Sequence, residues 1–249
     1  MDNIAECNRK IEVDMYRAAA LVDSATGYKG LRIHALPGLH DYTAECIYSH
    51  VAPGTSVLDL AAGSGAMSQR LVDAGYVVTA TDYVTENFRL HSSVPFFQAD
   101  LNEQFSRGRE NSFGAIMASE IIEHLENPRN FTRECFNLLA PGGVLVLSTP
   151  NLDNAASITG FLRSGAFQWF SDREYRRDGH ITPLTQWQIS KCIGEAGFES
   201  LEMKSFGDPY GMVRGSPRLL LLSKAINLLS PGNSCHRGQI FVGVFRKPA

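Results

Sequence analysis

Short apolar runs alternate with amphipathic stretches over most of the chain. Five runs have the length and the β-branched, aliphatic composition of buried strands. They predict strands at 56–60, 76–81, 95–99, 113–118 and 143–148. Apolar positions at helical spacing predict helices between them, at 66–74, 84–90 and 128–139, the last ended by a turn at 140–143. Strands that alternate with helices in this way form a mainly parallel α/β sheet with helices on both faces.

The last third of the chain departs from this simple alternation. A helix is predicted at 185–196, followed by a strand at 198–206 and, after a gap, an alternating strand at 239–246. An amphipathic segment at 9–23 and a loop with glycine and proline precede the first strand. We therefore expect one domain over residues 1–249. Its parts are an N-terminal helical segment (1–43), a core (44–150, 185–206 and 239–247) and two insertions (151–184 and 207–238).

The second insertion contains an unusually apolar stretch at 218–229. Short apolar runs are usually core, so we expect a helix that packs on the protein or on a second copy in a homodimer, in preference to a membrane contact. Nowhere do about 18 apolar residues run together, so no membrane span is expected.

The amino-acid composition argues against several classes of protein. The 23 basic and 26 acidic residues give a net charge of −3, so no global field attracts nucleic acid or an anionic membrane. Five cysteines occur without C-x-x-C pairing, and this odd number suits reduced thiols. The first residues carry no basic region followed by an apolar stretch, which predicts a protein that is not exported. Together these features predict a cytoplasmic location.

The clearest candidate for chemistry is the turn after the first predicted strand. Asp59 lies inside that strand, and Gly63 and Gly65 follow it before the helix at 66–74 begins. Glycines let the backbone turn sharply and approach a ligand, and the helix N-terminus offers N–H groups. Asp82 ends the next strand, where an acid can accept hydrogen bonds from both hydroxyls of a ribose. The pattern predicts a site for a nucleoside cofactor.

The same residues bear on which nucleoside is bound. A dinucleotide site favours G-x-G-x-x-G/A, but Ser68 stands at the third position, and the carboxylate of Asp59 would repel a diphosphate. That carboxylate suits an ammonium group, as in the methionine part of S-adenosylmethionine. An NAD-dependent oxidoreductase and a non-catalytic methyltransferase-like partner subunit remain the alternatives at this point.

Four motifs in order then give a family resemblance: 57–65, Asp82, 98–101 and 139–145. With them, residues 44–206 and the final strand resemble the class I S-adenosylmethionine-dependent methyltransferases. The resemblance implies a Rossmann-like, doubly wound, seven-stranded sheet, mostly parallel with the last strand antiparallel. It also implies that Asp100 and Leu101 contact the adenine. The expected cofactor residues are Asp59, Ala61, Gly63, Gly65, Asp82, Tyr83, Asp100, Leu101 and Ser119.

A second motif follows the fourth predicted strand. If 119–125 is helical, Glu120, Glu123 and His124 stand at i, i+3 and i+4 on one face, a plausible three-ligand site for a divalent metal. A solvated helix face with a capping histidine is the alternative. The segment resembles the E-x-x-E-H segment of the ubiquinone-biosynthesis O-methyltransferases and of the small-RNA 3′-terminal 2′-O-methyltransferases. In the RNA enzymes a downstream histidine completes the metal site, which implies His180 here.

These residues favour O-methylation. A hydroxyl is a poor nucleophile at neutral pH, so His124 or His180 acts as a general base, or a metal lowers the hydroxyl pKa. The metal, Mg²⁺, Mn²⁺ or Zn²⁺, would be held by Glu120, Glu123, His124 and His180. We expect a small-molecule, quinone-precursor or glycan acceptor, shaped by the two insertions and residues 24–42. The 3′ end of an RNA is the alternative acceptor, although no RNA-binding module flanks the core.

Overall fold

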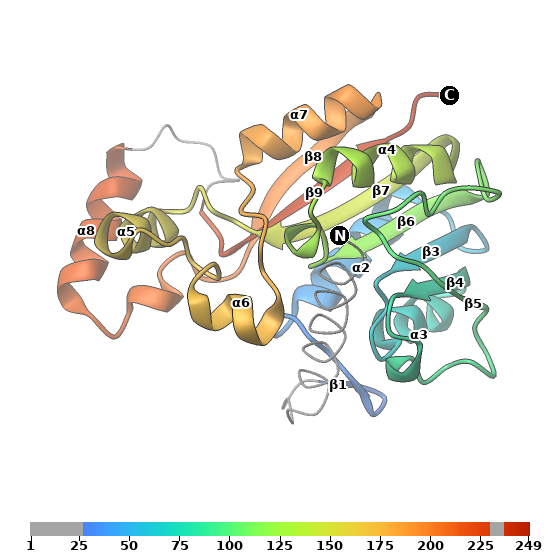
Figure 1. Cartoon of the computed structure of the whole chain (residues 1–249), viewed down its shortest axis with the longest axis horizontal. Helices are drawn as coiled ribbons and strands as arrows, with labels where there is room; N and C mark the ends of the chain where they lie inside the picture. The colour runs from blue at the N-terminus through green and yellow to red at the C-terminus, as the bar shows by residue number, and fades with distance from the viewer. Residues whose placement is uncertain (1–26, 230–236) are drawn as a thin grey trace, which may run out of the picture.

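The computed structural model describes residues 27–229 and 237–249, and it is built around one seven-stranded sheet (Figure 1). The strands lie side by side in the order β5-β4-β3-β6-β7-β9-β8. Their bounds are β3 (Ser56–Leu60), β4 (Val77–Asp82), β5 (Phe96–Gln98), β6 (Phe113–Ser119), β7 (Leu139–Pro150), β8 (Glu199–Phe206) and β9 (Ile240–Arg246). A separate two-stranded sheet pairs β1 (Gly27–Tyr28) with β2 (Leu31–Arg32).

The sheet confirms the expected Rossmann-like topology. β3 pairs in parallel with both β4 and β6, so the order of strands reverses on either side of β3. β9 lies antiparallel to β7 and to β8, and it is the one reversed strand of the sheet. In open sheets of this kind, ligands bind beyond the carboxyl ends of the strands where the order reverses. This edge of β3, β4 and β6 is therefore where a site should lie.

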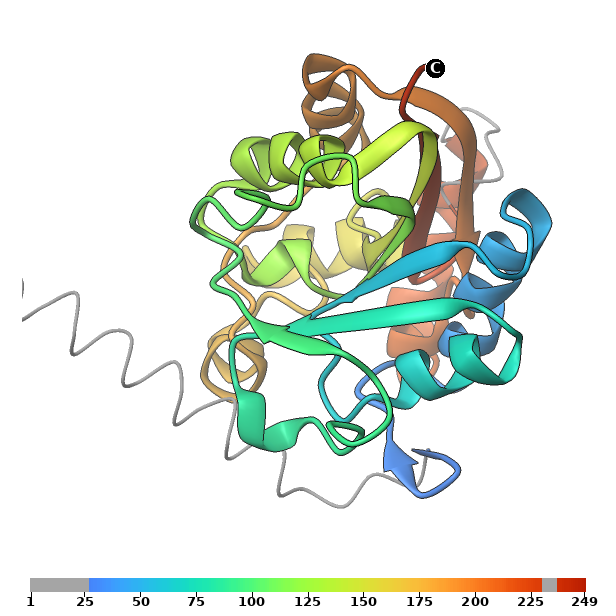
Figure 2. The same ribbon diagram turned by 90° about the vertical axis from the view of Figure 1, so that its right-hand side faces the viewer.

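Alternate residues of each central strand enter two different cores. Val57 and Met117 face the core shared with α2 (Leu39–His50) and α3 (Ala66–Asp73). Leu58 and Ile116 face the core shared with α4 (Pro128–Leu138) and α7 (Gln186–Ala196). Figure 2 shows helices on both sides of the sheet. Strands buried on both faces explain why the sequence shows continuous apolar runs there instead of strict alternation.

Three local expectations were wrong. Residues 84–90 form only the short 3-10 turn η1 (Thr85–Asn87), and the segment 119–125 contains only η2 (Ile122–His124). Residues 140–143 are not a free turn, because β7 already begins at Leu139 and its pairing with β6 is irregular there. In each case strand ends and tertiary contacts override the local helical or turn pattern.

The regions outside the core contain more helix than the sequence indicated. The first insertion carries α5 (Ala155–Ser164) and α6 (Asp172–Asp178), and the second carries η3 (Gly211–Val213) and α8 (Pro217–Leu229). In the expected N-terminal helical segment, the described part is a hairpin until α2 begins, and the predicted helix at 9–23 lies outside the described residues. Over 27–229 and 237–249, no helix is both long and apolar enough to cross a bilayer.

Candidate active site

A cavity of about 600 Å³ opens at the carboxyl ends of β3, β4 and β6. This volume falls within the range of roughly 300–1,000 Å³ that is usual for small-molecule sites. Six of the predicted cofactor residues line it: Ala61, Gly63, Asp82, Tyr83, Asp100 and Leu101. Three of the predicted metal or catalytic residues line it too: Glu120, His124 and His180. The sheet therefore brings most of both predicted sets to one cavity.

At one end, Asp82 is fixed by the backbone around it. The N–H of Gly63 donates to its Oδ2 at 2.8 Å, and the N–H of Val84 donates to its Oδ1 at 2.9 Å. Gly63 reaches this position with φ of +53°, a conformation that glycine adopts without steric cost. Each carboxylate oxygen keeps a further lone pair for a ligand hydroxyl. The turn and the acid are thus oriented together before any ligand binds.

Three predicted cofactor residues stand behind the cavity wall. The side chain of Asp59 is buried and accepts the Ser68 hydroxyl at 2.5 Å, and burial raises its pKa to about 7. Gly65 has φ of +92°, and a Cβ there would meet Phe88 and Leu90 at 3.0 Å. The hydroxyl of Ser119 lies 3.1 Å from that of Ser148. These residues shape the turn and the strand end.

Beyond β6 the backbone turns at Glu120, which has φ of +53° although it is not a glycine. The Ser148 hydroxyl donates to Glu120 Oε1 at 3.1 Å, and the Ser148 carbonyl accepts the Glu120 N–H at 3.1 Å. Glu123 is completely buried and accepts the Thr149 hydroxyl on Oε2 at 2.9 Å. Within the described residues, no donor reaches Glu123 Oε1. A buried carboxylate oxygen without a partner is costly, so this oxygen is suited to a ligand.

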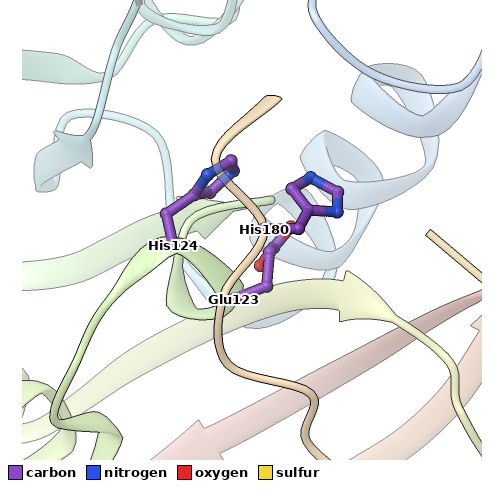
Figure 3. A group of neighbouring side chains, drawn as sticks. All are labelled: Glu123, His124 and His180. Carbon is purple, nitrogen blue, oxygen red and sulfur yellow. The ribbon is translucent and has the colours of Figure 1, made fainter. Parts of the chain in front are cut away.

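Backbone hydrogen bonds bring His180 to this turn from 56 residues away. The N–H groups of Ile181 and Thr182 both donate to the Glu123 carbonyl, at 3.1 and 2.9 Å. The rings of His124 and His180 then lie 4.8 Å apart, edge to face. One ligand atom from each of Glu123, His124 and His180 lies within 4.8 Å of the others. Figure 3 shows the two imidazoles beside the Glu123 side chain.

Burial sets the protonation of this acceptor-end cluster, which we define as Glu120, Glu123, His124 and His180. It raises the pKa of Glu120 to about 7 and that of Glu123 well above the usual range, with Glu120 adding to the rise at Glu123. It lowers the pKa of His124 to about 3, and it lowers the pKa of His180. Both imidazoles are therefore neutral at pH 7. Because a carbonyl only accepts, His180 donates from Nδ1 to Trp169 at 2.8 Å and keeps a lone pair on Nε2.

The cavity is also lined by residues outside the predicted cofactor and metal sets. Residues 30–36 form one wall, and Trp169, Arg177 and Asp178 of the first insertion form another. Trp169 has φ of +70°, and three of the five described non-glycine residues with positive φ line the cavity: Ala61, Glu120 and Trp169. Such strained positions concentrate at functional sites. The sequence predicted that 24–42 and the first insertion shape the acceptor pocket, but no motif or periodic pattern identified Trp169 or Asp178 in it.

The two insertions differ in their relation to the cavity. The first contributes Trp169, Arg177, Asp178 and His180, whereas no described residue of 207–229 lines the cavity. The side chains of Arg173 and Arg176 lie outside it, at a separate surface hollow on α6. The expectation that both insertions shape the same pocket therefore receives support only for the first.

The chain is similar in sequence to known methyltransferases. A family model described as a methyltransferase domain matches residues 32–203. The ubiquinone biosynthesis O-methyltransferase of Xanthomonas campestris pv. campestris is 37% identical over 132 residues, 50% of this chain and 54% of the relative. The enzyme of that name from Psychrobacter arcticus is 36% identical over 157 residues, 58% of this chain and 59% of the relative. The chain thus spans little more than half the length of these relatives.

Solved structures share the fold at low sequence identity. A 1,6-didemethyltoxoflavin-N1-methyltransferase from Burkholderia thailandensis, with S-adenosylhomocysteine bound, gives a TM-score of 0.62 at 15% identity, covering 100% of this chain and 90% of that one. A SAM-dependent methyltransferase from Archaeoglobus fulgidus gives 0.58 at 14% identity, covering 84% and 93%. The family match rejects the alternative of an NAD-dependent oxidoreductase. Because the family model covers more than half of the chain and the glycine turn and Asp82 meet at one cavity, the chain belongs to the S-adenosylmethionine-dependent methyltransferases.

Proposed function

We propose that this methyltransferase transfers the methyl group to a hydroxyl oxygen of a small acceptor, with a quinone precursor as the first candidate and a glycan hydroxyl as the second. The observation that carries the proposal is the acceptor-end cluster, of which Glu120, His124 and His180 line the same cavity as the cofactor residues, with Glu123 buried beside the two histidines. Its neutral imidazoles and buried carboxyls suit the handling of a hydroxyl proton. The relatives named ubiquinone biosynthesis O-methyltransferases support a quinone precursor.

The cofactor would bind along the turn and the ends of β4 and β5. Asp82 would accept both ribose hydroxyls, Asp100 the adenine amine, and Leu101 would cover the ring face. Ala61, Gly63 and Tyr83 line the same end. Gly65 and Ser119 would support it from behind, and Asp59, when ionised, would act on the cofactor's ammonium group through its charge.

Arg32 is our candidate for the cofactor's carboxylate. It lines the cavity, and its carbonyl accepts the Ser64 hydroxyl at 2.6 Å, which holds it beside the glycine turn. A guanidinium can bind a carboxylate with two parallel hydrogen bonds. The hairpin that carries Arg32 would thereby close one side of the cofactor site.

A divalent metal fits the acceptor-end cluster. Glu123 Oε1 is buried without a donor among the described residues, and both histidines are neutral, as metal ligands must be. Glu123, His124 and His180 would hold the ion, with Glu120 as an adjacent carboxylate. Two imidazoles and one carboxylate favour Zn²⁺ or Mn²⁺ over Mg²⁺, which prefers oxygen ligands. A bound ion would supply Lewis-acid activation of the acceptor hydroxyl.

The protein's own residues would align the acceptor and accept its proton. The cavity walls align the acceptor oxygen behind the sulfonium methyl, because positioning supplies much of the rate in such a displacement. A group with a pKa near 3 is a weak base, so His124 suits a ligand or orienting role. The Nε2 atom of His180, with its lone pair kept by the bond to Trp169, is the better acceptor for the hydroxyl proton when no metal is used.

The acceptor would lie against Trp169. Its ring lines the cavity and its Nε1 is buried with no hydrogen-bond partner among the described residues, so this N–H can donate to an acceptor oxygen. Arg177 and Asp178, which pair with each other at 2.6 Å, stand at the same wall. An aromatic acceptor with neighbouring oxygens matches this combination of ring face, donor and charge.

The deciding experiment is a methyl-transfer assay with labelled cofactor against a catechol, a nucleotide sugar and a short RNA. Each acceptor is tested as purified, after chelation, and after adding back Mg²⁺, Mn²⁺ or Zn²⁺. We expect transfer to the catechol oxygen, loss on chelation and recovery with Mn²⁺ or Zn²⁺. Transfer only to nitrogen or carbon would overturn the proposal, and activity that survives chelation would leave His180 as the base.

A matched pair of variants localises the metal. Glu123→Gln should abolish stoichiometric metal binding measured by calorimetry and elemental analysis, while Glu126→Gln should not. Glu126 is exposed, lies just after η2 and stands outside the cluster. Equal metal content in both variants would remove the metal from the proposal. Salt-sensitive transfer to the RNA would instead support the 2′-O-methylation alternative.

The cytoplasmic location stays a proposal as well. The three described cysteines, Cys46, Cys135 and Cys192, are unpaired and buried. Free buried thiols are stable in a reducing compartment. Recovery of the native protein with the cytoplasm and the inner face of its membrane would support this location, and recovery in the periplasmic or culture fraction would contradict it.

A further inference from the structure

Helix α8 is apolar on both its inner and its outer side. Ser223 is its completely buried residue, and Leu219, Leu220 and Ile226 are half-buried. On the outer side, Leu221, Leu228 and Leu229 are 71%, 86% and 84% exposed. A surface helix of a water-soluble protein turns polar residues outward, so this exposed leucine face is arranged for surroundings other than water.

A contact with α5 fixes the rotation of α8. The Thr159 hydroxyl donates to the Ala155 carbonyl at 2.7 Å, so the Ser223 hydroxyl donates to Thr159 across the two helices at 2.8 Å. Both side chains are completely buried. This hydroxyl seam keeps the Ser223 side of α8 against α5, and Leu221, Leu228 and Leu229 lie on the exposed side.

The exposed apolar surface continues onto the elements that touch α8. Leu222 of α8 is 43% exposed, Phe161 and Leu162 at the end of α5 are 44% and 67% exposed, and Met212 in η3 is 54% exposed. α5, η3 and α8 all contact one another. Figure 1 shows α5 and α8 together at one end of the molecule, away from β4 and β5. We call these seven side chains the α5–α8 surface.

The charges beside this surface have one sign. Arg163, Arg218 and Lys224 are exposed on α5 and α8, and Arg214 pairs with Asp208 at 2.6 Å. The sequence has no acidic residue in 155–171 or in 209–229, although the whole chain carries a net charge of −3. An apolar surface bordered by cations complements an anionic lipid bilayer.

From this placement we infer that the α5–α8 surface binds an anionic membrane surface, with its leucines among the acyl chains and its cations at the headgroups. A helix of 13 residues is about 20 Å long, too short to span a hydrocarbon core of about 30 Å, so α8 lies in the membrane plane. A second copy is a poorer occupant. A two-fold interface brings the same cations together, and neither helix offers an acid to pair with them.

The surface is joined to the cavity wall. The hydroxyl of Ser157 in α5 accepts the N–H of Gln168 at 3.2 Å, and Trp169, the next residue, lines the cavity. A lipid-soluble acceptor could therefore enter from the side that faces the bilayer. That consequence rests on the proposed function, whereas membrane binding itself does not involve methyl transfer.

The test is co-sedimentation of the full chain with vesicles of phosphatidylcholine alone or mixed with phosphatidylglycerol. We expect partitioning to the anionic vesicles at least about tenfold stronger than to the neutral ones, and weaker in high salt. Leu228→Glu/Leu229→Glu should lower it by about tenfold or more. The control Val77→Glu/Trp187→Glu places the same charges at exposed apolar positions on β4 and α7 and should bind like the unchanged chain.

A second pair of variants tests the cations beside the surface, with folding checked separately. Arg218→Gln/Lys224→Gln should weaken binding to anionic vesicles several-fold, while Arg173→Gln/Arg176→Gln on α6 should not. Melting temperature and methyl transfer to a water-soluble acceptor report whether each variant is folded, independently of binding. Absence of vesicle binding by the unchanged chain would overturn the inference. So would a dimer in sedimentation velocity that dissociates in Leu228→Glu/Leu229→Glu without any vesicle binding, which would assign the surface to a second copy.

Discussion

The two ends of the cavity are built in different ways. The cofactor end comes from consecutive strands and their turns, between β3 and the end of β5, and both oxygens of Asp82 are held by nearby backbone N–H groups. The acceptor end joins η2 to the chain after α6, and Glu123 Oε1 has no donor among the described residues. In this protein the local motif orients its acid with two backbone donors, whereas the end assembled from distant segments leaves one buried carboxyl oxygen without a donor among the described residues.

The difference also appears in the backbone. At the cofactor end the sharp turn is made mainly by glycines, which adopt positive φ without strain. At the acceptor end Glu120 and Trp169 hold positive φ at a cost of about 1–3 kcal/mol each. Strain of this kind persists only where surrounding contacts impose it. The acceptor end should therefore be the more sensitive to changes in distant residues.

The largest expected effect is a loss of turnover without a loss of cofactor affinity, which distinguishes the acceptor end from the cofactor end. His124→Ala should lower turnover by about 10²-fold or more, because it removes a ligand or orienting group of the acceptor-end cluster and misplaces the acceptor. Cofactor affinity, measured by calorimetry, should stay within about twofold. His50→Ala, on α2 outside the cavity, is the control. A parallel loss of cofactor affinity in His124→Ala would erase the distinction between the ends.

The second effect concerns Asp59, whose pKa is raised by burial from 3.8 to about 7. The folded state binds this proton more tightly than the unfolded state. The stability contributed by the protonated group is therefore present below about pH 4 and is lost as pH rises through about 7. Asp59→Asn should remove this loss. The gain in free energy of unfolding of the variant over the unchanged chain should therefore be about 2–4 kcal/mol larger at pH 8 than at pH 4.

Denaturant unfolding across this pH range measures the effect. If Asp59 only supports the turn through Ser68, cofactor affinity at pH 8 should change little, because asparagine still accepts that hydroxyl. A drop of about tenfold or more would show that its charge acts on the cofactor. An unaltered pH slope in the variant would mean that Asp59 is not the buried titrating group.

The third effect belongs to the cofactor end alone. Asp82→Ala should weaken S-adenosylmethionine binding in calorimetry by about 1.5–3 kcal/mol, the scale of hydrogen bonds to a charged group. Turnover at saturating cofactor should fall only a few-fold. Asp172→Ala, on α6, gives the baseline for removing an exposed acid. Unchanged affinity would show that Asp82 is not the ribose acid.

The smallest effect tests how the acceptor end is assembled. The Thr182 hydroxyl donates to the Leu125 carbonyl and helps to hold His180 beside η2. Thr182→Val should cost about 1 kcal/mol of unfolding free energy and lower turnover a few-fold. Thr55→Val loses a similar bond, to the Ala52 carbonyl, outside the cavity and should leave turnover unchanged. Equal turnover in both variants would mean that this contact does not position His180.

The outcome for individual elements shows where prediction from the sequence succeeds. The strands at 56–60 and 113–118 were placed within one residue, because strands buried on both faces give continuous apolar runs. The segment 119–125 was misjudged, since its spacing fits a helix while contacts with β7 and with residues 181–182 impose a 3-10 turn. The helix at 218–229 was predicted and packs on the protein as α8, but its rotation is set by the hydroxyl seam with α5, which is a tertiary contact.

By itself the sequence predicted the alternating strands and helices of the sheet and the glycine turn beside Asp82, because these depend on periodicity and on residues close together along the chain, and the resemblance of its motifs gave the family and the one reversed strand. Only the tertiary structure decided how His180 meets His124, which backbone positions are strained, and which face of α8 meets solvent. Each of these depends on contacts between segments far apart in the sequence. Such contacts leave no periodic pattern, so they become visible only when the chain is folded.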